Sequence, residues 1–210
     1  MKLLSFPILS LITDSSVYQN KEKMVNNITQ TTKVGVNMVQ IREKNLSNEE
    51  KKKLIQKIIV KTNNKPIIII NDGYELCKVF DIDGIHLPEK KINQIKNLKS
   101  TLKYDQIIGC SVHSLKSAIL AEKLGANYLQ FGSIFKTKSH PGQNPLGLSE
   151  LKKITANINL PVIAVGGINE KNCLLPFQNG AYGIASIRSF SEQTTSIKII
   201  NKLNNGEIIW

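Results

Sequence analysis

Eight short apolar segments alternate with amphipathic segments along this chain, and each apolar segment ends in polar residues or glycine. Buried parallel strands have this apolar character, and the segments between them have the period of helices. Consecutive βαβ units are therefore predicted. A doubly wound sheet would alternate in the same way, but eight strands without a Gly-x-Gly-x-x-Gly fingerprint after the first favour a closed barrel. The predicted strands span residues 8–13, 38–42, 66–71, 84–87, 106–111, 128–132, 161–166 and 183–187.

Several predicted helices have recognisable ends. Serine caps the first turn of a helix well, and glycine adopts the left-handed conformation that ends one. The chain also shows no repeat and no interdomain linker, so we expect one α/β domain over residues 1–210, a (β/α)8 TIM barrel. The expected helix boundaries are a capping box from Ser47 to Glu50, a cap at Ser114 for 115–124, a start at Ser149 for 151–156, and ends at Gly125 and Gly180.

Basic residues exceed acidic ones but are spread along the predicted helices. The chain has 28 Lys and Arg against 16 Asp and Glu, a net charge of +12. Because these lysines are dispersed and no basic strand carries interleaved aromatic residues, we predict a solvated outer surface that attracts small anions, with no nucleic-acid partner. The alternative is a basic protein that binds nucleic acid, and salt-sensitive binding to unrelated DNA would favour it.

The cysteines and the apolar segments bear on where the protein works. Three widely separated cysteines indicate neither a disulfide framework nor a metal site, which fits a reducing, cytoplasmic setting. The apolar stretch 1–12 runs into Thr13 without a cleavage site, so we interpret it as the first strand. No segment approaches the ~18 uninterrupted apolar residues of a membrane span, and we expect no membrane partner. Whether copies of the chain form a homo-oligomer is left open.

Two cations and an amide follow one another at the end of the second predicted strand. Strand alternation would point Gln40, Arg42 and Lys44 to the same side, into the mouth of the barrel. Guanidinium and ammonium groups suit phosphate oxygens, so the three side chains could hold a diphosphate. The alternative is that Arg42 pairs with a glutamate inside the barrel.

An amide and a carboxylate end the third predicted strand. Asp72 could hold a Mg²⁺ ion that bridges diphosphate oxygens, and Asn71 could donate to the same group. The alternative is that Asn71-Asp72-Gly73 forms only a turn or a helix cap.

Segments along nearly the whole chain resemble those of thiamine phosphate synthase and its relative TenI, the thiazole tautomerase of thiamin biosynthesis. Each segment is modest, but eight of them in the same order are specific. The segments are Leu11-Ile-Thr-Asp14, Gln40-Ile-Arg-Glu-Lys44, Ile70-Asn-Asp72, Asp83-Gly-Ile-His-Leu87, Ile108-Gly-Cys-Ser-Val-His-Ser114, Ala126-Asn-Tyr-Leu-Gln-Phe-Gly132, Ala164-Val-Gly-Gly-Ile168 and Gly180-Ala-Tyr-Gly-Ile184.

The resemblance implies a reaction: hydroxymethylpyrimidine diphosphate condenses with a thiazole phosphate and releases pyrophosphate. Small phosphorylated molecules would be its partners and Mg²⁺ its cofactor. Arg42, Lys44, Ser111 and His140 are the expected catalytic residues, and Asp72 and Glu89 the expected metal ligands. The expected substrate-binding residues are Gln40, Arg42, Lys44 and Asn71 for the diphosphate, Ser111 for the pyrimidine, Gly167, Ile187 and Arg188 for the thiazole phosphate, and Thr137.

Four positions depart from the family patterns. The second Mg²⁺ ligand of the synthase corresponds to Lys91, which cannot coordinate a metal, so Glu89 would have to substitute. Arg188 replaces a phosphate-site serine, and His140, on the irregular segment 136–146 that we expect to be a lid, stands near a synthase lysine. The acid/base histidine of TenI is replaced by Ser133, which cannot shuttle protons unaided. We predict a synthase first, a tautomerase second, and a non-catalytic thiazole-phosphate binder third.

Overall fold

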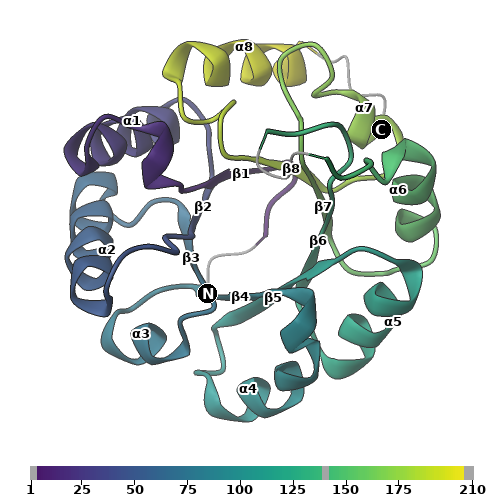
Figure 1. Ribbon diagram of the computed structural model, residues 1–210, viewed down its shortest axis with the longest axis horizontal. Coiled ribbons are helices and arrows are strands. Elements are labelled where there is room, and N and C mark those ends of the chain that lie inside the picture. The colour runs from purple at the N-terminus through teal and green to yellow at the C-terminus, as the bar shows by residue number, and fades with distance from the viewer. Residues whose placement is uncertain (1–3, 139–141, 206–210) are drawn as a thin grey trace.

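Parallel strands close into a barrel in the computed structural model, which describes residues 4–138 and 142–205 (Figure 1). Each strand pairs with its neighbours in chain order, and β8 closes the barrel by pairing with β1. The predicted (β/α)8 barrel is thus confirmed, and each end of every strand lies within one residue of its expected position. The strands are β1 (Ile8–Ile12), β2 (Met38–Ile41), β3 (Ile67–Asn71), β4 (Gly84–Leu87), β5 (Ile107–Val112), β6 (Tyr128–Gly132), β7 (Val162–Val165) and β8 (Gly183–Ser186).

Helices form a ring around the barrel (Figure 1). Two 3-10 helices, η1 (Ser15–Val17) and η2 (Glu89–Gln94), lie in loops after strands. The α-helices are α1 (Lys21–Lys33), α2 (Asn48–Thr62), α3 (Tyr74–Val79), α4 (Ile95–Thr101), α5 (Leu115–Leu124), α6 (Gly147–Thr155), α7 (Leu175–Gln178) and α8 (Gln193–Asn204).

Most of the predicted helix ends are confirmed. Ser47 and Glu50 form the expected capping box of α2, and Ser114 caps α5, which ends at Gly125 in the left-handed conformation. The predicted start at Ser149 is wrong, because α6 begins at Gly147, where no side chain caps the helix. Ser149 therefore lies inside the first turn rather than before it.

Two apolar layers support the barrel. The larger layer lies between the strands and the surrounding helices, and the smaller one fills the barrel interior. Alternate residues of the strands supply the two layers, as the pleat requires, except that β4 adds none to the interior layer. The interior layer contains Ile8, Ile12, Met38, Ile67, Ile69, Ile107, Tyr128, Ile163 and Ala185.

Candidate active site

Polar side chains replace the apolar ones in the barrel interior toward the carboxyl ends of the strands. Gln40 of β2 is 2% exposed and accepts a hydrogen bond from the side-chain amide of Gln130 of β6. Because β2 and β6 are not neighbours in the barrel, the two amides must meet across its interior. Gln40 therefore points inward as predicted.

A second buried chain of hydrogen bonds joins three neighbouring strands. His86 of β4 contacts the Ser111 hydroxyl of β5 through Nε2 at 2.8 Å and the Tyr128 hydroxyl of β6 through Nδ1 at 3.1 Å. Burial lowers the pKa of His86 to about 3, so the imidazole is neutral at physiological pH. His86 is thus a packed residue that orients Ser111, whose side chain is partly exposed to the barrel mouth.

Arg42 and Lys44 lie beyond the end of β2 rather than on it. The Arg42 backbone N–H donates to Thr13 Oγ1 at 3.0 Å, and its side chain is half-buried, whereas Lys44 is exposed. Glu43 between them is buried, and its Oε2 accepts from the Ser15 N–H at 3.0 Å. Within residues 4–138 and 142–205, no ion pair joins Arg42 to a glutamate, so the alternative of such a pair inside the barrel is wrong.

Asn71 and Asp72 end β3 as predicted, but their surroundings differ. Asn71 Oδ1 is buried without a hydrogen-bond partner, next to His86 in the sheet register. Asp72 has a φ of +52°, and its carboxylate accepts two hydrogen bonds from Lys91 Nζ, at 2.6 and 2.8 Å. Lys91 lies in η2, on the loop after β4.

The second predicted metal ligand is also engaged by a neighbour. Glu89 accepts hydrogen bonds from His113 Nδ1 at 2.6 Å and from the His113 backbone N–H at 3.2 Å. Burial raises the pKa of Glu89, but hydrogen bonds from Ser117 and His113 outweigh it, so the pKa lies below its usual value. The carboxylate is therefore ionised near neutral pH.

These contacts do not suit a magnesium site. Mg²⁺ requires oxygen ligands at about 2.1 Å in octahedral geometry, and an ammonium group already lies against both oxygens of Asp72. No cluster of three or more His, Cys, Asp or Glu residues that could hold a metal occurs in the described part of the chain. Magnesium binding at Asp72 and Glu89 stays a prediction that the arrangement of donors does not support.

The loops after β6 and β7 pack closely against each other. The Ile134 and Phe135 N–H groups donate to the carbonyls of Val165 and Gly166 at 2.9 and 3.1 Å. Gly167 has a φ of +67°, and a Cβ atom there would lie 2.4 Å from the carbonyl oxygen of Lys136. Only glycine fits this position, because a side chain would collide with the loop after β6.

The remaining predicted residues lie in the loops after β6 and β8. Ile187 is partly buried and Arg188 exposed, directly after β8, while Thr137 is partly buried. The segment after β8 is tied to the loop after β7, because Ser189 Oγ donates to the Ile168 carbonyl at 2.6 Å. His140 lies outside the described residues.

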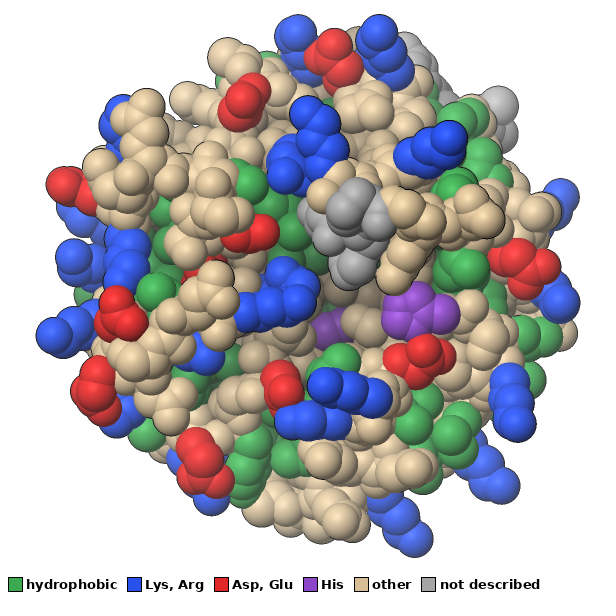
Figure 2. Space-filling model, viewed as in Figure 1, with side chains coloured by type: hydrophobic (Ala, Val, Ile, Leu, Met, Phe, Trp, Pro, Cys, Tyr) green, Lys and Arg blue, Asp and Glu red, His purple; other side chains and the backbone are tan. Residues whose placement is uncertain are grey.

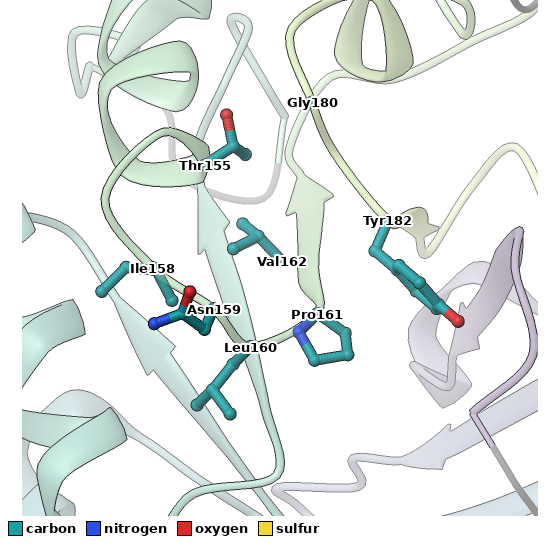
Figure 3. A pocket seen from close by; sticks show the side chains of 8 residues that line it. All are labelled: Thr155, Ile158, Asn159, Leu160, Pro161, Val162, Gly180 and Tyr182. Carbon is teal, nitrogen blue, oxygen red and sulfur yellow. The ribbon is translucent and has the colours of Figure 1, made fainter. Parts of the chain in front are cut away.

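Figure 2 shows Lys and Arg, acidic and histidine side chains gathered around the centre of one face of the barrel. A hollow of about 150 Å³ lies elsewhere, beside the beginning of β7, where Thr155, Asn159 and Tyr182 are among its lining residues (Figure 3). Barrel enzymes work at the carboxyl ends of their strands, so this hollow is not the candidate site.

Sequence reasoning missed three contacts of the site. Gln130 contacts Gln40, and Tyr128 contacts His86. Both residues lie on β6, and the two-residue period of this strand could have indicated that they point into the barrel. The contact of Lys91 with Asp72 joins loops 19 residues apart and left no local signal.

Comparisons with known proteins identify relatives of this chain. Residues 9–190 match the family described as "Thiamine monophosphate synthase". "Putative thiamine-phosphate synthase 2" of Aquifex aeolicus is 38% identical over 90% of this chain and 100% of its own length. Thiamine-phosphate synthase of Clostridium acetobutylicum is 35% identical over 85% of this chain and 84% of its own.

A solved structure shares both the fold and part of the sequence. Thiamine phosphate pyrophosphorylase from Pyrococcus furiosus superposes with a TM-score of 0.83 at 27% identity, over 95% of this chain and 96% of that one. Both the sequence and the architecture of this protein therefore make it a member of the thiamine monophosphate synthase family.

Proposed function

We propose that this protein is a transferase that joins hydroxymethylpyrimidine diphosphate to a thiazole phosphate, forming thiamine phosphate and pyrophosphate. The observation that carries the proposal is the barrel mouth itself. Cationic side chains follow β2, a partly exposed serine lies on β5, and a glycine loop follows β7. The names of the family and of the relatives in two bacteria support the same reaction.

The diphosphate would lie on the β2–β4 side of the mouth. Arg42 offers a planar fork of donors that matches phosphate oxygens, and Lys44 adds a mobile charge. The buried Oδ1 of Asn71 has no donor, so a hydrogen-bond donor on the bound pyrimidine could satisfy it. Ser111, held by neutral His86, would contact the pyrimidine ring.

The thiazole phosphate would lie on the β6–β8 side. Gly167 lets the loop after β7 pack directly against the Lys136 carbonyl, which fixes this loop, and backbone N–H groups in a fixed turn can hold a phosphate. Ile187 and Arg188 follow directly from β8, where barrels of this class commonly hold a phosphate. The two substrates would thus meet over the polar centre of the barrel.

In this reaction the protein has two tasks, to stabilise the charge of the leaving group and to position the two substrates. The bond between the pyrimidine methylene carbon and the diphosphate oxygen breaks, and the thiazole nitrogen forms a bond to that carbon. Arg42 and Lys44 stabilise the negative charge that develops on the leaving diphosphate. The fixed loops hold the nitrogen opposite the leaving group, which lowers the entropic barrier.

The test is to incubate the purified protein with both substrates and to measure pyrophosphate and thiamine phosphate. We expect stoichiometric formation of both products. Absence of product, together with exchange of a thiazole proton into heavy water, would assign the tautomerase activity instead. Product formation with Arg42→Ala at the wild-type rate would contradict the role of the guanidinium in stabilising the leaving diphosphate.

We also propose a cytoplasmic location. Cys77, Cys110 and Cys173 are all buried free thiols, and burial raises the pKa of both Cys77 and Cys110 to about 12. Such thiols are unreactive and suit a reducing compartment. Within the described ranges, no helix has the length and apolar character needed to cross a bilayer.

A further inference from the structure

Lys91 contacts both carboxylate oxygens of Asp72, the residue expected to hold a metal ion. Its Nζ atom lies 2.6 Å from one carboxylate oxygen and 2.8 Å from the other, within the range of charge-assisted hydrogen bonds. The two side chains are 34% and 39% exposed, so a ligand in the mouth can reach the pair. A protein-borne cation therefore neutralises the carboxylate.

The backbone holds the two partners in place. The Asp72 N–H donates to the His86 carbonyl at 2.9 Å, which ties the end of β3 to β4. The Lys91 N–H donates to the Pro88 carbonyl at 2.9 Å within the turn that follows β4. Both loops are therefore anchored at the carboxyl ends of adjacent strands.

The ammonium group keeps capacity for a further acceptor. A lysine has three N–H donors, and Asp72 accepts two of them. Asp72 with Mg²⁺ would carry a net charge of +1, whereas Asp72 with Lys91 carries zero. The net positive charge for a diphosphate then comes from Arg42 and Lys44, and Lys91 adds its third N–H donor.

We infer that the diphosphate site works without a divalent cation, and that Lys91, held by Asp72, donates to the diphosphate in place of the metal. This inference rests on the proposed function, because that function brings a diphosphate to the mouth. It accounts for a lysine at a metal-ligand position and for Glu89 being engaged by His113.

Calorimetric titration with inorganic pyrophosphate tests the inference without requiring turnover. In chelator, we expect wild type to bind pyrophosphate and Lys91→Asp to bind about tenfold or more weakly, as expected for loss of a charged hydrogen bond. Added Mg²⁺ should restore binding to Lys91→Asp, because a second carboxylate beside Asp72 provides the missing ligand. Wild-type binding should need no metal.

Lys90→Asp is the matched control, because Lys90 is the exposed neighbour in the same turn and the charge change is identical. It should bind pyrophosphate like wild type in chelator. Thermal unfolding of Lys91→Asp shows whether the variant is folded. If it is not, Asp72→Asn takes its place, because this variant frees Lys91 but leaves it charged. Asp72→Asn should bind pyrophosphate without metal.

The inference and the proposed function can fail separately. Wild-type binding of pyrophosphate only with Mg²⁺, or under neither condition, would overturn the inference, as would equal losses in Lys90→Asp and Lys91→Asp. Metal-independent pyrophosphate binding without any condensation activity would support the inference while removing the proposed reaction.

Discussion

The two sides of the barrel mouth present different groups. On the β2–β4 side, long charged side chains surround the strand ends, where Asp72 is paired with Lys91 and Glu89 with His113. On the β6–β8 side, glycine and tightly bonded loops present backbone instead.

This difference matches what each substrate must do. A diphosphate that leaves during the reaction gains negative charge, and mobile cations can follow it out of the site. A phosphate that only anchors its molecule needs fixed donors that lose little entropy on binding. The comparison therefore predicts that changes on one side affect mainly one substrate.

The largest effect should come from Arg42→Ala. Loss of the guanidinium removes charge stabilisation of the leaving diphosphate, so kcat/KM should fall about a hundredfold to a thousandfold. Steady-state kinetics with varied pyrimidine diphosphate measure the change. Lys33→Ala, which removes one positive charge from the end of α1, serves as the control and should change kcat/KM less than about threefold.

Gly167→Ala should have a smaller effect that falls on the other substrate. The new methyl group would lie 2.4 Å from the Lys136 carbonyl oxygen, so the loop must shift and the phosphate contact weakens. We expect KM for the thiazole phosphate to rise about tenfold and unfolding free energy to fall by about 1–2 kcal/mol.

Gly147→Ala separates backbone strain, which lowers stability, from the loop shift, which weakens the phosphate contact. Gly147 also has a positive φ, +84°, but nothing lies within 4 Å of an added Cβ atom. It should lose stability by a similar amount with little change in KM. A rise in KM as large as that of Gly167→Ala would contradict the role of the β7 loop.

His86 lies between the two sides and predicts a pH effect on stability. Its pKa is about 3 in the folded protein, below the unfolded value near 6.5, so the unfolded chain binds more protons between these pH values. The contribution of His86 to the free energy of unfolding therefore keeps its full value above pH 6.5 and falls as the pH drops toward 3. His86 should account for a loss of roughly 2 kcal/mol between pH 7 and 4.5.

Urea unfolding at several pH values measures this loss. The His86→Gln variant should show a shallower dependence on pH than wild type, because glutamine does not titrate. Identical slopes for the two proteins would show that His86 is not held neutral by burial.

Asn71→Leu should have the smallest effect on stability, and in the opposite direction. Removing a buried oxygen that has no hydrogen-bond partner should raise the free energy of unfolding by up to about 1 kcal/mol. Activity should fall, because the proposed function gives this oxygen a donor on the substrate. Loss of stability in chemical denaturation would indicate that the amide already has a structural partner.

Most of the fold could be predicted from local patterns. Apolar runs identified the strands, and Ser47 and Ser114 identified two helix starts. These signals can be read from the sequence because each cap contacts only residues a few positions away. The start of α6 could not be predicted in this way, since Leu146 precedes it without any capping side chain and Ser149 gave a false signal.

The candidate site could be predicted only in part. Strand alternation placed Gln40 correctly, but β2 ends at Ile41, so alternation says nothing of Arg42 and Lys44 beyond it. The sequence showed that Lys91 cannot bind a metal, yet its contact with Asp72 depends on how two loops meet in space. Such contacts follow from tertiary structure alone.

One measurement tests the division of the mouth most directly: calorimetric titration of Arg42→Ala and Gly167→Ala with inorganic pyrophosphate and, separately, with the thiazole phosphate. The account predicts that Arg42→Ala loses affinity for pyrophosphate and keeps affinity for the thiazole phosphate, while Gly167→Ala does the reverse. Equal losses for both ligands in both variants would contradict it.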